Sequence, residues 1–275
     1  MTKTGDLLQY ASRSIPRNEA LLLLAKALDC TKETLIAHPE KDVPPVVENQ
    51  YKIWINRVEK GFPATYILGV QSFWGYDFSV TPAVLIPRPD TETLIETVLQ
   101  LSRQSVSPSI LDLGTGSGAI AVTLALAIPS ASVTATDISP DAIAVAKANA
   151  SRLNARITFL QSNWFDAIDN HQQFDYIVSN PPYIHPMDPH LKRLAFEPLS
   201  ALTDHKDGLA CFRAIIGQAS SYLSQGGTLV LEHGFDQGEA VRMLFAESGD
   251  FSQAKTVRDL GGNERVTYAA KRNQD

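Results

Sequence analysis

Asn180-Pro181-Pro182-Tyr183 is the tetrapeptide whose residue types best suit chemistry on a planar amino group. The two prolines lack backbone N–H donors and stiffen the turn, so the carbonyls of Asn180 and Pro181 are left as acceptors. With the Asn180 side-chain oxygen they form a cradle for the hydrogens of a planar NH2 group, on which Tyr183 can stack. Such a nitrogen has a delocalised lone pair, so it must be held in line for attack while acceptors stabilise the developing charge. We predict Asn180, Pro181 and Tyr183 as catalytic and all four residues as substrate-binding; the alternative is a rigid surface turn.

A glycine-rich loop follows a short apolar run that ends at Leu113. Glycines there allow a tight turn and a close approach to a ligand that any Cβ would block. The spacing is G-x-G-x-G and not the G-x-G-x-x-G of dinucleotide sites, and the preceding Asp112 would repel a pyrophosphate. A cation suits the loop better, and S-adenosylmethionine, with its ammonium and sulfonium groups, is such a ligand. The alternative is a turn that only closes a strand-to-helix corner. The residues predicted to bind this cofactor are Gly114, Thr115, Gly116, Ser117 and Gly118.

Two further strand ends carry residues suited to the rest of this cofactor. Asp137 closes the next predicted strand, where a carboxylate can accept hydrogen bonds from both hydroxyls of a ribose. Trp164 follows the third strand, where an indole can pack on adenine. The alternatives are an N-cap role for Asp137, which Ser139 could fill instead, and a place in the core for Trp164. We predict that Asp137 and Trp164 contact the cofactor.

These motifs lie in a region where predicted strands and helices alternate, which implies βαβ crossovers and a mostly parallel sheet. The chain is therefore predicted to be of the α/β class. The turn at residues 259–263 predicts that the last strand returns antiparallel. The predicted strands are Ser109–Leu113, Ser132–Asp137, Arg156–Gln161, Phe174–Ser179, Thr228–Glu232, Ala254–Arg258 and Arg265–Ala270.

Three domains are predicted along the chain. Residues 1–62 show four short helical patterns, with Pro16 and Pro44 near helix starts, and predict a small helical bundle for substrate recognition. Residues 63–87 are rich in β-branched and aromatic types and predict a β-hairpin linker. Residues 88–275 hold the motifs described above and form the catalytic domain.

The composition is that of a globular protein without the charge of a nucleic-acid binder. The 275 residues are 44% hydrophobic and 20% charged, and the net charge is −6. Cys30 and Cys211 match no metal or redox spacing, which favours reduced thiols and a cytoplasmic setting. No segment predicts a signal peptide or a membrane span. His185, Asp188 and His190 lie on one loop and predict a solvated surface, so no metal is expected.

The order of the glycine loop, the acidic second-strand end and N-P-P-Y resembles the class I S-adenosylmethionine-dependent methyltransferases that act on planar amino groups. The flanking segments narrow the resemblance to the release factor glutamine methyltransferases, the PrmC/HemK family, and it runs through nearly the whole chain. The P-R-P-D-T-E stretch is the most selective part of it. The segments that carry this resemblance are Phe78–Glu92, Phe196–Pro198, Leu231–Gly234, Gln237–Gly238, Arg258–Asp259 and Asn263–Arg265.

The resemblance implies a seven-stranded Rossmann-like domain that methylates the side-chain amide nitrogen (N5) of the glutamine in the Gly-Gly-Gln motif of class I peptide chain release factors. It also implies that the glycine loop, Asp137, Trp164 and Asn180 hold S-adenosylmethionine, while residues 180–183 hold the glutamine. Methylation of a large-subunit ribosomal protein, methylation of a nucleic-acid amino group and a non-catalytic docking role on the translation machinery stay open as alternatives. We expect a cytoplasmic, monomeric protein that binds neither nucleic acid nor membrane.

Overall fold

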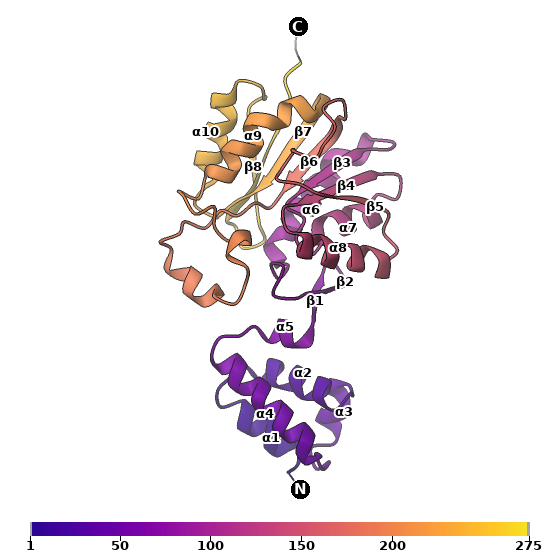
Figure 1. Cartoon of the computed structure of the whole chain (residues 1–275), viewed down its shortest axis with the longest axis vertical. Coiled ribbons are helices and arrows are strands. Elements are labelled where there is room, and N and C mark those ends of the chain that lie inside the picture. The colour runs from indigo at the N-terminus through magenta and orange to yellow at the C-terminus, as the bar shows by residue number, and fades with distance from the viewer. Residues whose placement is uncertain (1, 274–275) are drawn as a thin grey trace. The chain divides into compact units, whose positions relative to one another are not determined.

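The computed structural model describes residues 2–273 of the chain (Figure 1). Its internal contacts divide the described chain into two compact units, Met1–Val70 and Gln71–Asp275. Among the described residues, no helix is long and apolar enough to cross a membrane.

The first unit is helical, with its own apolar core. Leu7, Leu23, Leu24 and Ile55 are almost fully buried in it, and the buried Tyr51 donates its hydroxyl hydrogen to the Ala20 carbonyl at 3.0 Å. The four predicted helices are present at the predicted places. Within residues 2–70 the helices are α1 Thr4–Ala11, α2 Arg17–Ala27, α3 Lys32–Ala37, α4 Pro45–Glu59 and α5 Ala64–Leu68.

Helix α5 corrects one expectation, because residues 64–68 were predicted as part of the hairpin linker. The helix begins after Pro63, and it ends where Gly69 takes the left-handed conformation with φ 76°. The hairpin itself is shorter than predicted and consists of β1 Val70–Phe73 and β2 Tyr76–Ser79. Phe73 and Phe78 of this hairpin are buried in the core of the second unit.

The second unit contains a sheet of seven strands among the described residues, in the order β5-β4-β3-β6-β7-β9-β8. The pairs of β3 with β4, β3 with β6, β4 with β5 and β6 with β7 are parallel, and β9 is antiparallel to both of its neighbours. The strand order reverses between β3 and β6, and open α/β sheets bind ligands at such a switch point. The strands are β3 Ser109–Leu113, β4 Ser132–Asp137, β5 Ile157–Gln161, β6 Phe174–Ser179, β7 Leu223–Glu232, β8 Lys255–Arg258 and β9 Glu264–Ala270.

Strand β7 begins five residues before the predicted start at Thr228. Its first residue pairs with Phe174 of β6, and the register shifts between Phe174 and Tyr176. Gly226 and Gly227 lie within this irregular stretch, and Gly226 has φ 72°. A glycine pair is typical of a breaker in sequence, whereas here it accommodates a bulge inside a strand.

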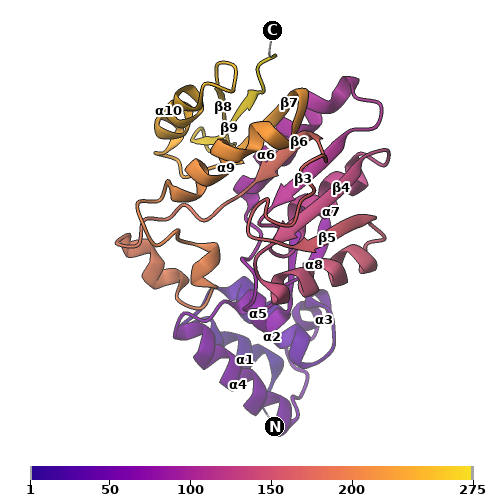
Figure 2. The same ribbon diagram turned by 45° about the horizontal axis from the view of Figure 1, so that its top comes forward.

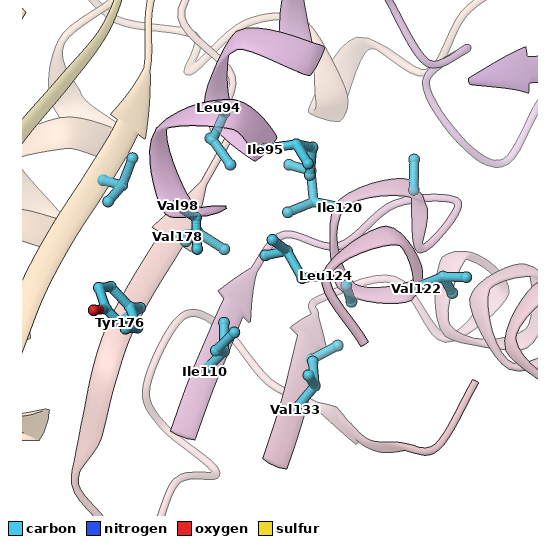
Figure 3. Close-up of a cluster of buried hydrophobic side chains, with 14 of the residues drawn as sticks. Leu94, Ile95, Val98, Ile110, Ile120, Val122, Leu124, Val133, Tyr176 and Val178 are labelled. Atoms are coloured by element: carbon cyan, nitrogen blue, oxygen red, sulfur yellow. The ribbon is translucent and has the colours of Figure 1, made fainter. Parts of the chain in front are cut away.

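Helices cover both faces of the sheet (Figure 1). On one face, helices α6 and α7 pack on the sheet in a continuous apolar cluster (Figure 3). The cluster includes Leu94 and Val98 of α6, Leu124 of α7, and Ile110 and Val178 of the sheet. The other face is covered by α9 and α10, whose core side chains include Phe212, Ile215 and Phe245. The helices of this unit are α6 Glu92–Leu101, α7 Ala119–Ala127, α8 Pro140–Arg152, α9 Ala210–Tyr222 and α10 Gly238–Ser248, with 3-10 turns at Pro89–Thr91, Ser102–Gln104, Pro189–Leu194 and Leu199–Ala201.

The segment between β6 and α9 extends outward from the sheet in both views (salmon in Figures 1 and 2). It follows directly on the Asn180-Pro181-Pro182-Tyr183 turn, so it lies on the side of the sheet where the parallel strands end. The segment therefore begins at the edge of the sheet that carries the predicted motifs.

Candidate active site

A cavity of about 350 Å³ lies at the carboxyl ends of β3, β4, β5 and β6. Its volume is within the range of small-molecule sites. Each predicted motif contributes to the lining, because every one of these strands ends at the same edge of the sheet. The lining includes Gly114, Thr115, Gly116, Ser117, Asp137, Ser162, Asn163, Trp164, Asn180 and Pro182, together with Arg88, Thr91, Pro198, Asp204 and Cys211.

The glycine loop is anchored beneath this cavity by hydrogen bonds to β4 and α8. The backbone N–H groups of Gly114 and Thr115 donate to the Thr136 carbonyl at 2.9 and 2.8 Å. The buried Asn149 of α8 donates to the Ser117 carbonyl at 2.9 Å. The loop thus has a preorganised shape, with Gly114 to Ser117 facing the cavity.

Gly118 is the member of the predicted loop that does not line the cavity. It precedes α7 with φ 82°, and a Cβ there would lie 3.1 Å from the Ala146 Cβ and 3.2 Å from its Cα. The residue therefore allows α7 to pack closely on α8, in a backbone conformation that side chains disfavour.

We expect Gly118→Ala to lower the free energy of unfolding by about 2–4 kcal/mol, since it adds left-handed strain to an overpacked contact. Urea unfolding followed by circular dichroism measures this loss. Gly116→Ala is the matched control, because Gly116 has φ 56° but no atom within 4 Å of its added Cβ. Equal losses for the two variants would contradict a packing role for Gly118.

Asp137 connects the glycine loop to the start of α8. Its Oδ2 accepts the Gly116 N–H and its Oδ1 accepts the Ser139 N–H, both at 2.9 Å. Ser139 caps the helix instead, with its Oγ accepting the Ala142 N–H at 3.2 Å. Burial raises the pKa of Asp137, and the N–H groups of Ser139 and Gly116 oppose that rise. A carboxylate has about four lone-pair sites, so two remain for the hydroxyls of a ligand.

Trp164 lines the cavity and also packs against the apolar cluster that contains Phe212 and Phe245. Its position is therefore compatible with both roles considered from the sequence, contact with a ligand and a place in the core. Its indole lies beside the loop, with Cζ3 3.6 Å from the position of a Cβ on Gly114. The backbone of Trp164 has φ 49°, which is unusual for a bulky residue and indicates a turn held by its surroundings. The neighbouring Ser162 and Asn163 add polar atoms to the same wall.

The Asn180 tetrapeptide divides between the cavity and the protein interior. Asn180 and Pro182 line the cavity, whereas Pro181 is buried and Tyr183 lies outside the lining. The Asn180 Nδ2 donates to the Thr91 hydroxyl at 3.3 Å. The Tyr183 carbonyl accepts the Gln237 Nε2–H at 3.0 Å, which ties the turn to the segment after β7.

The Tyr183 phenol faces a group of charged residues. Burial raises its pKa, the negative charge of Glu232 acts in the same direction, and Arg265 opposes both. Arg265 is itself buried and contacts Asp259 Oδ2 at 3.2 Å and Asp90 Oδ2 at 3.3 Å. This arginine therefore joins the final hairpin to the Pro89–Thr91 turn and to Tyr183.

Sequence reasoning gave no role to two polar residues next to Asn180, namely Thr91 and Glu232. Thr91 lines the cavity, and Glu232 is 1% exposed at the end of β7. The signal available in the sequence was their membership of the P-R-P-D-T-E and L-E-H-G segments. A carboxylate at the end of a strand as apolar as Leu229–Leu231 is itself a marker of a site, since buried charges are rare without a function.

The outward segment is pinned to the cavity by Glu197, whose side chain is 3% exposed. Glu197 Oε1 accepts the Arg88 Nη2–H and its Oε2 accepts the Ile86 N–H at 3.2 Å. Arg88, which also lines the cavity, is therefore paired with an acid of the chain itself.

We expect Arg88→Ala to destabilise the protein by about 1–3 kcal/mol, because a buried carboxylate then keeps only one hydrogen-bond partner. Proteolytic cleavage within residues 184–206 should rise in the same variant, and limited proteolysis read by mass spectrometry measures it. Arg88→Lys keeps the positive charge, so it should lose less stability and be cleaved less than Arg88→Ala. An unchanged cleavage rate in Arg88→Ala would show that the ion pair does not hold the segment.

The residues of the cavity fit S-adenosylmethionine. Asp137 offers acceptors for ribose hydroxyls, and Trp164 offers an apolar ring face. Asp112 lies fully buried beneath the loop, outside the lining, where its Oδ2 accepts the Thr115 hydroxyl at 2.6 Å. Burial raises the pKa of Asp112 to about 7, and its Oδ1 has no hydrogen-bond partner among the described residues. An unsatisfied acceptor under the loop suits a cationic ligand above it.

Known proteins resemble this chain over nearly its whole length. Residues 2–69 match the family model of the PrmC N-terminal domain, and residues 89–195 match that of the methyltransferase small domain. The chain is 46% identical to the release factor glutamine methyltransferase of Bordetella pertussis, over 97% of this chain and 98% of the relative. It is 47% identical to that of Salmonella typhimurium, over 94% of each chain.

Solved structures share the fold at low sequence identity. A methyltransferase from Pyrococcus furiosus superposes with a TM-score of 0.54 at 19% identity, covering 82% of this chain and 98% of its own. The T. thermophilus 16S rRNA N2 G1207 methyltransferase, in complex with AdoMet and guanosine, has a TM-score of 0.55 at 20% identity, covering 74% of this chain and 50% of its own. The α/β methyltransferase fold predicted from the sequence is confirmed.

Proposed function

This chain belongs to the release factor glutamine methyltransferase family, and on that premise we propose which atom it methylates and which of its residues do so. The activity is transfer of a methyl group from S-adenosylmethionine to a glutamine of a release factor. The proposed acceptor is the N5 amide nitrogen of the glutamine in the Gly-Gly-Gln motif of class I release factors. The observation that carries this proposal is the position of Asn180, which lies on the wall of the same cavity as the glycine loop and Asp137.

The cofactor is proposed to lie along the carboxyl ends of β3, β4 and β5. When bound, S-adenosylmethionine supplies an electrophilic methyl group on its sulfonium. Asp137 accepts hydrogen bonds from the ribose hydroxyls, and Trp164 packs against the adenine. Residues 114–117 surround the methionine part, where the nearby carboxylate of Asp112 favours positive charge. Gly118 contributes through the packing of α7.

The glutamine amide is proposed to bind at Asn180. The Asn180 side-chain oxygen and the backbone carbonyls of Asn180 and Pro181 accept the amide hydrogens and hold the nitrogen in line with the methyl group. As positive charge develops on the nitrogen, these preorganised acceptors stabilise it. As the bond between the nitrogen and the methyl carbon forms, the bond between that carbon and the sulfur breaks. The nitrogen becomes acidic in this step, so its proton can pass to water and the acceptors need not include a strong base. Pro182 lines the cavity beside Asn180, and Tyr183, which lies outside the lining, shapes the turn.

We also propose roles for the rest of the chain. Residues 1–62 recognise the substrate, residues 63–87 link, and residues 88–275 carry out the reaction. The protein acts as a monomer in the cytoplasm, without direct contact with nucleic acid. The net charge of −6 supports the last point, since duplex binding needs several phosphate contacts by basic side chains.

Mass spectrometry of a recombinant class I release factor tests the proposed atom. The release factor is incubated with this protein and S-adenosylmethionine, beside a variant in which the Gly-Gly-Gln glutamine is replaced by alanine. One added methyl group on that glutamine, absent in the variant, is expected. Methylation at another residue would overturn the assignment, and methylation of a large-subunit ribosomal protein instead would favour the sister activity.

A further inference from the structure

Asn180 has one side-chain amide, and its two ends differ in chemistry. Only Oδ1 accepts a hydrogen bond, whereas Nδ2 carries two donors. If the amide were turned by 180°, it would present an NH2 group to the NH2 group of a glutamine and repel it. This inference rests on the function proposed above, in which Asn180 Oδ1 accepts a hydrogen from the substrate.

Two residues from distant parts of the chain contact the Nδ2 end. Thr91 closes the Pro89–Thr91 turn before α6, and its Oγ1 accepts the Asn180 Nδ2–H at 3.3 Å. Glu232 ends β7 next to Asn180, because Ser179 of β6 pairs with Leu231 of the parallel strand β7 and these two residues follow them. Burial raises the pKa of Glu232 to about 7, and hydrogen bonds from Thr91 and Asn180, together with the positive charge of Arg265, act in the opposite direction.

When Glu232 is ionised, its carboxylate only accepts hydrogen bonds, so any group that bonds to it must be a donor. Thr91 must therefore donate its hydroxyl hydrogen to Glu232, which leaves its lone pairs for Asn180. The Asn180 group that contacts Glu232 must be the NH2 end. Both donors of Asn180 are thereby directed toward the protein, and Oδ1 is left for the cavity that Asn180 lines.

Burial makes this arrangement strict. Thr91 is 4% exposed and Glu232 is 1% exposed, so water does not readily replace a missing partner. Glu232 Oε2 has no hydrogen-bond partner among the described residues, so this one oxygen can still accept a hydrogen bond. Protein interiors satisfy nearly all buried polar atoms, and an unsatisfied carboxylate oxygen beside a substrate-binding amide is typical of a functional position.

We propose that Thr91 and Glu232 are positioning residues that hold the Asn180 amide with its oxygen facing the substrate glutamine. Neither touches the reacting atoms. Their role is to make the acceptor orientation of Asn180 the dominant one before the substrate arrives, which is preorganisation of the kind that raises kcat.

Steady-state methylation of a recombinant release factor by Thr91→Val, Thr91→Ser and Glu232→Gln tests this role. Thr91→Val keeps the side-chain shape and removes the hydroxyl, and Glu232→Gln adds a donor that can bond Asn180 in either orientation. We expect both to lower kcat about tenfold, the equivalent of one lost hydrogen bond, with KM for the release factor changed less than about twofold. Thr91→Ser should restore kcat to within about twofold of the parent, because it restores the hydroxyl. Cofactor affinity by calorimetry should stay unchanged in all three.

Asp175→Asn is the matched control for the loss of a hydrogen-bonded carboxylate. Asp175 lies at the opposite end of β6, where it accepts the Ser109 N–H at 2.8 Å and the Ser224 hydroxyl at 2.8 Å. It should lower the melting temperature and leave kcat unchanged. The proposal is overturned if Thr91→Val and Glu232→Gln keep the parental kcat, if Thr91→Ser is as impaired as Thr91→Val, or if Asp175→Asn lowers kcat equally. Absence of methylation by the parent protein would instead refute the proposed function.

Discussion

Replacing Asn180 with alanine is expected to lower kcat for release factor methylation by a factor on the order of 10³, the loss typical of removing one preorganised polar group from a transition-state site. Asn180 lines the cavity, where its Oδ1 is the proposed acceptor, and alanine leaves only the backbone carbonyls. Radiolabelled methyl transfer under saturating cofactor measures the change. Cofactor affinity should fall much less, because the glycine loop and Asp137 are held by hydrogen bonds that do not involve Asn180.

Asn180→Asp separates acceptor chemistry from charge. The aspartate has an acceptor oxygen for the substrate, but its other oxygen faces Thr91 and Glu232, where Asn180 presents its NH2 group. Repulsion between the two carboxylates should keep its kcat well below that of the parent. Full activity of Asn180→Ala would eliminate the proposed role of the side chain and leave the turn's backbone as the sole acceptor.

Replacing Asp137 with alanine is expected to raise the Kd for S-adenosylmethionine by about 100-fold, since hydrogen bonds to a charged group contribute about 1.5–3 kcal/mol. The substitution removes the acceptors for the ribose and also the two bonds that hold Gly116 and Ser139. Isothermal titration calorimetry with the cofactor measures the affinity. The kcat at saturating cofactor should change less than Kd, because Asp137 ends β4 and Asn180 follows β6, with β3 between these two strands.

Asp137→Asn is the control that keeps the shape of the side chain. Its oxygen can still accept one backbone N–H, but its NH2 group faces donors, so an intermediate loss of affinity is expected. An unchanged Kd in Asp137→Ala would mean that the cofactor does not bind along the end of β4.

The strands were predictable because short apolar runs alternate with helical patterns along the chain. The ends of β3, β4 and β6 match the predicted ends. Two errors came from local composition. Residues 64–68 are β-branched and aromatic in character but form α5 between Pro63 and a left-handed Gly69. The predicted strand began at Thr228, whereas long-range pairing with β6 begins β7 at Leu223.

The candidate site was also predictable from the sequence only in part. Motifs that directly follow a strand could be placed together from sequence, because parallel strands bring their carboxyl ends to one edge. The contacts of Glu197 with Arg88 and of Asn180 with Thr91 join residues 109 and 89 positions apart. No periodicity carries such a contact, since it depends on how the outward segment and the Pro89–Thr91 turn pack on that edge.

The sequence by itself determined the α/β class, the cofactor loop, the acidic strand end and the Asn180 turn, because each is encoded in a short segment whose local conformation requires its residue types. Only the tertiary structure decided that Gly118 serves packing, that Tyr183 lies beside Arg265 and Glu232, and that the Asn180 amide nitrogen contacts Thr91. These features depend on burial and on partners brought from other strands. A side chain's chemistry is local, but the direction in which it acts depends on its neighbours in space.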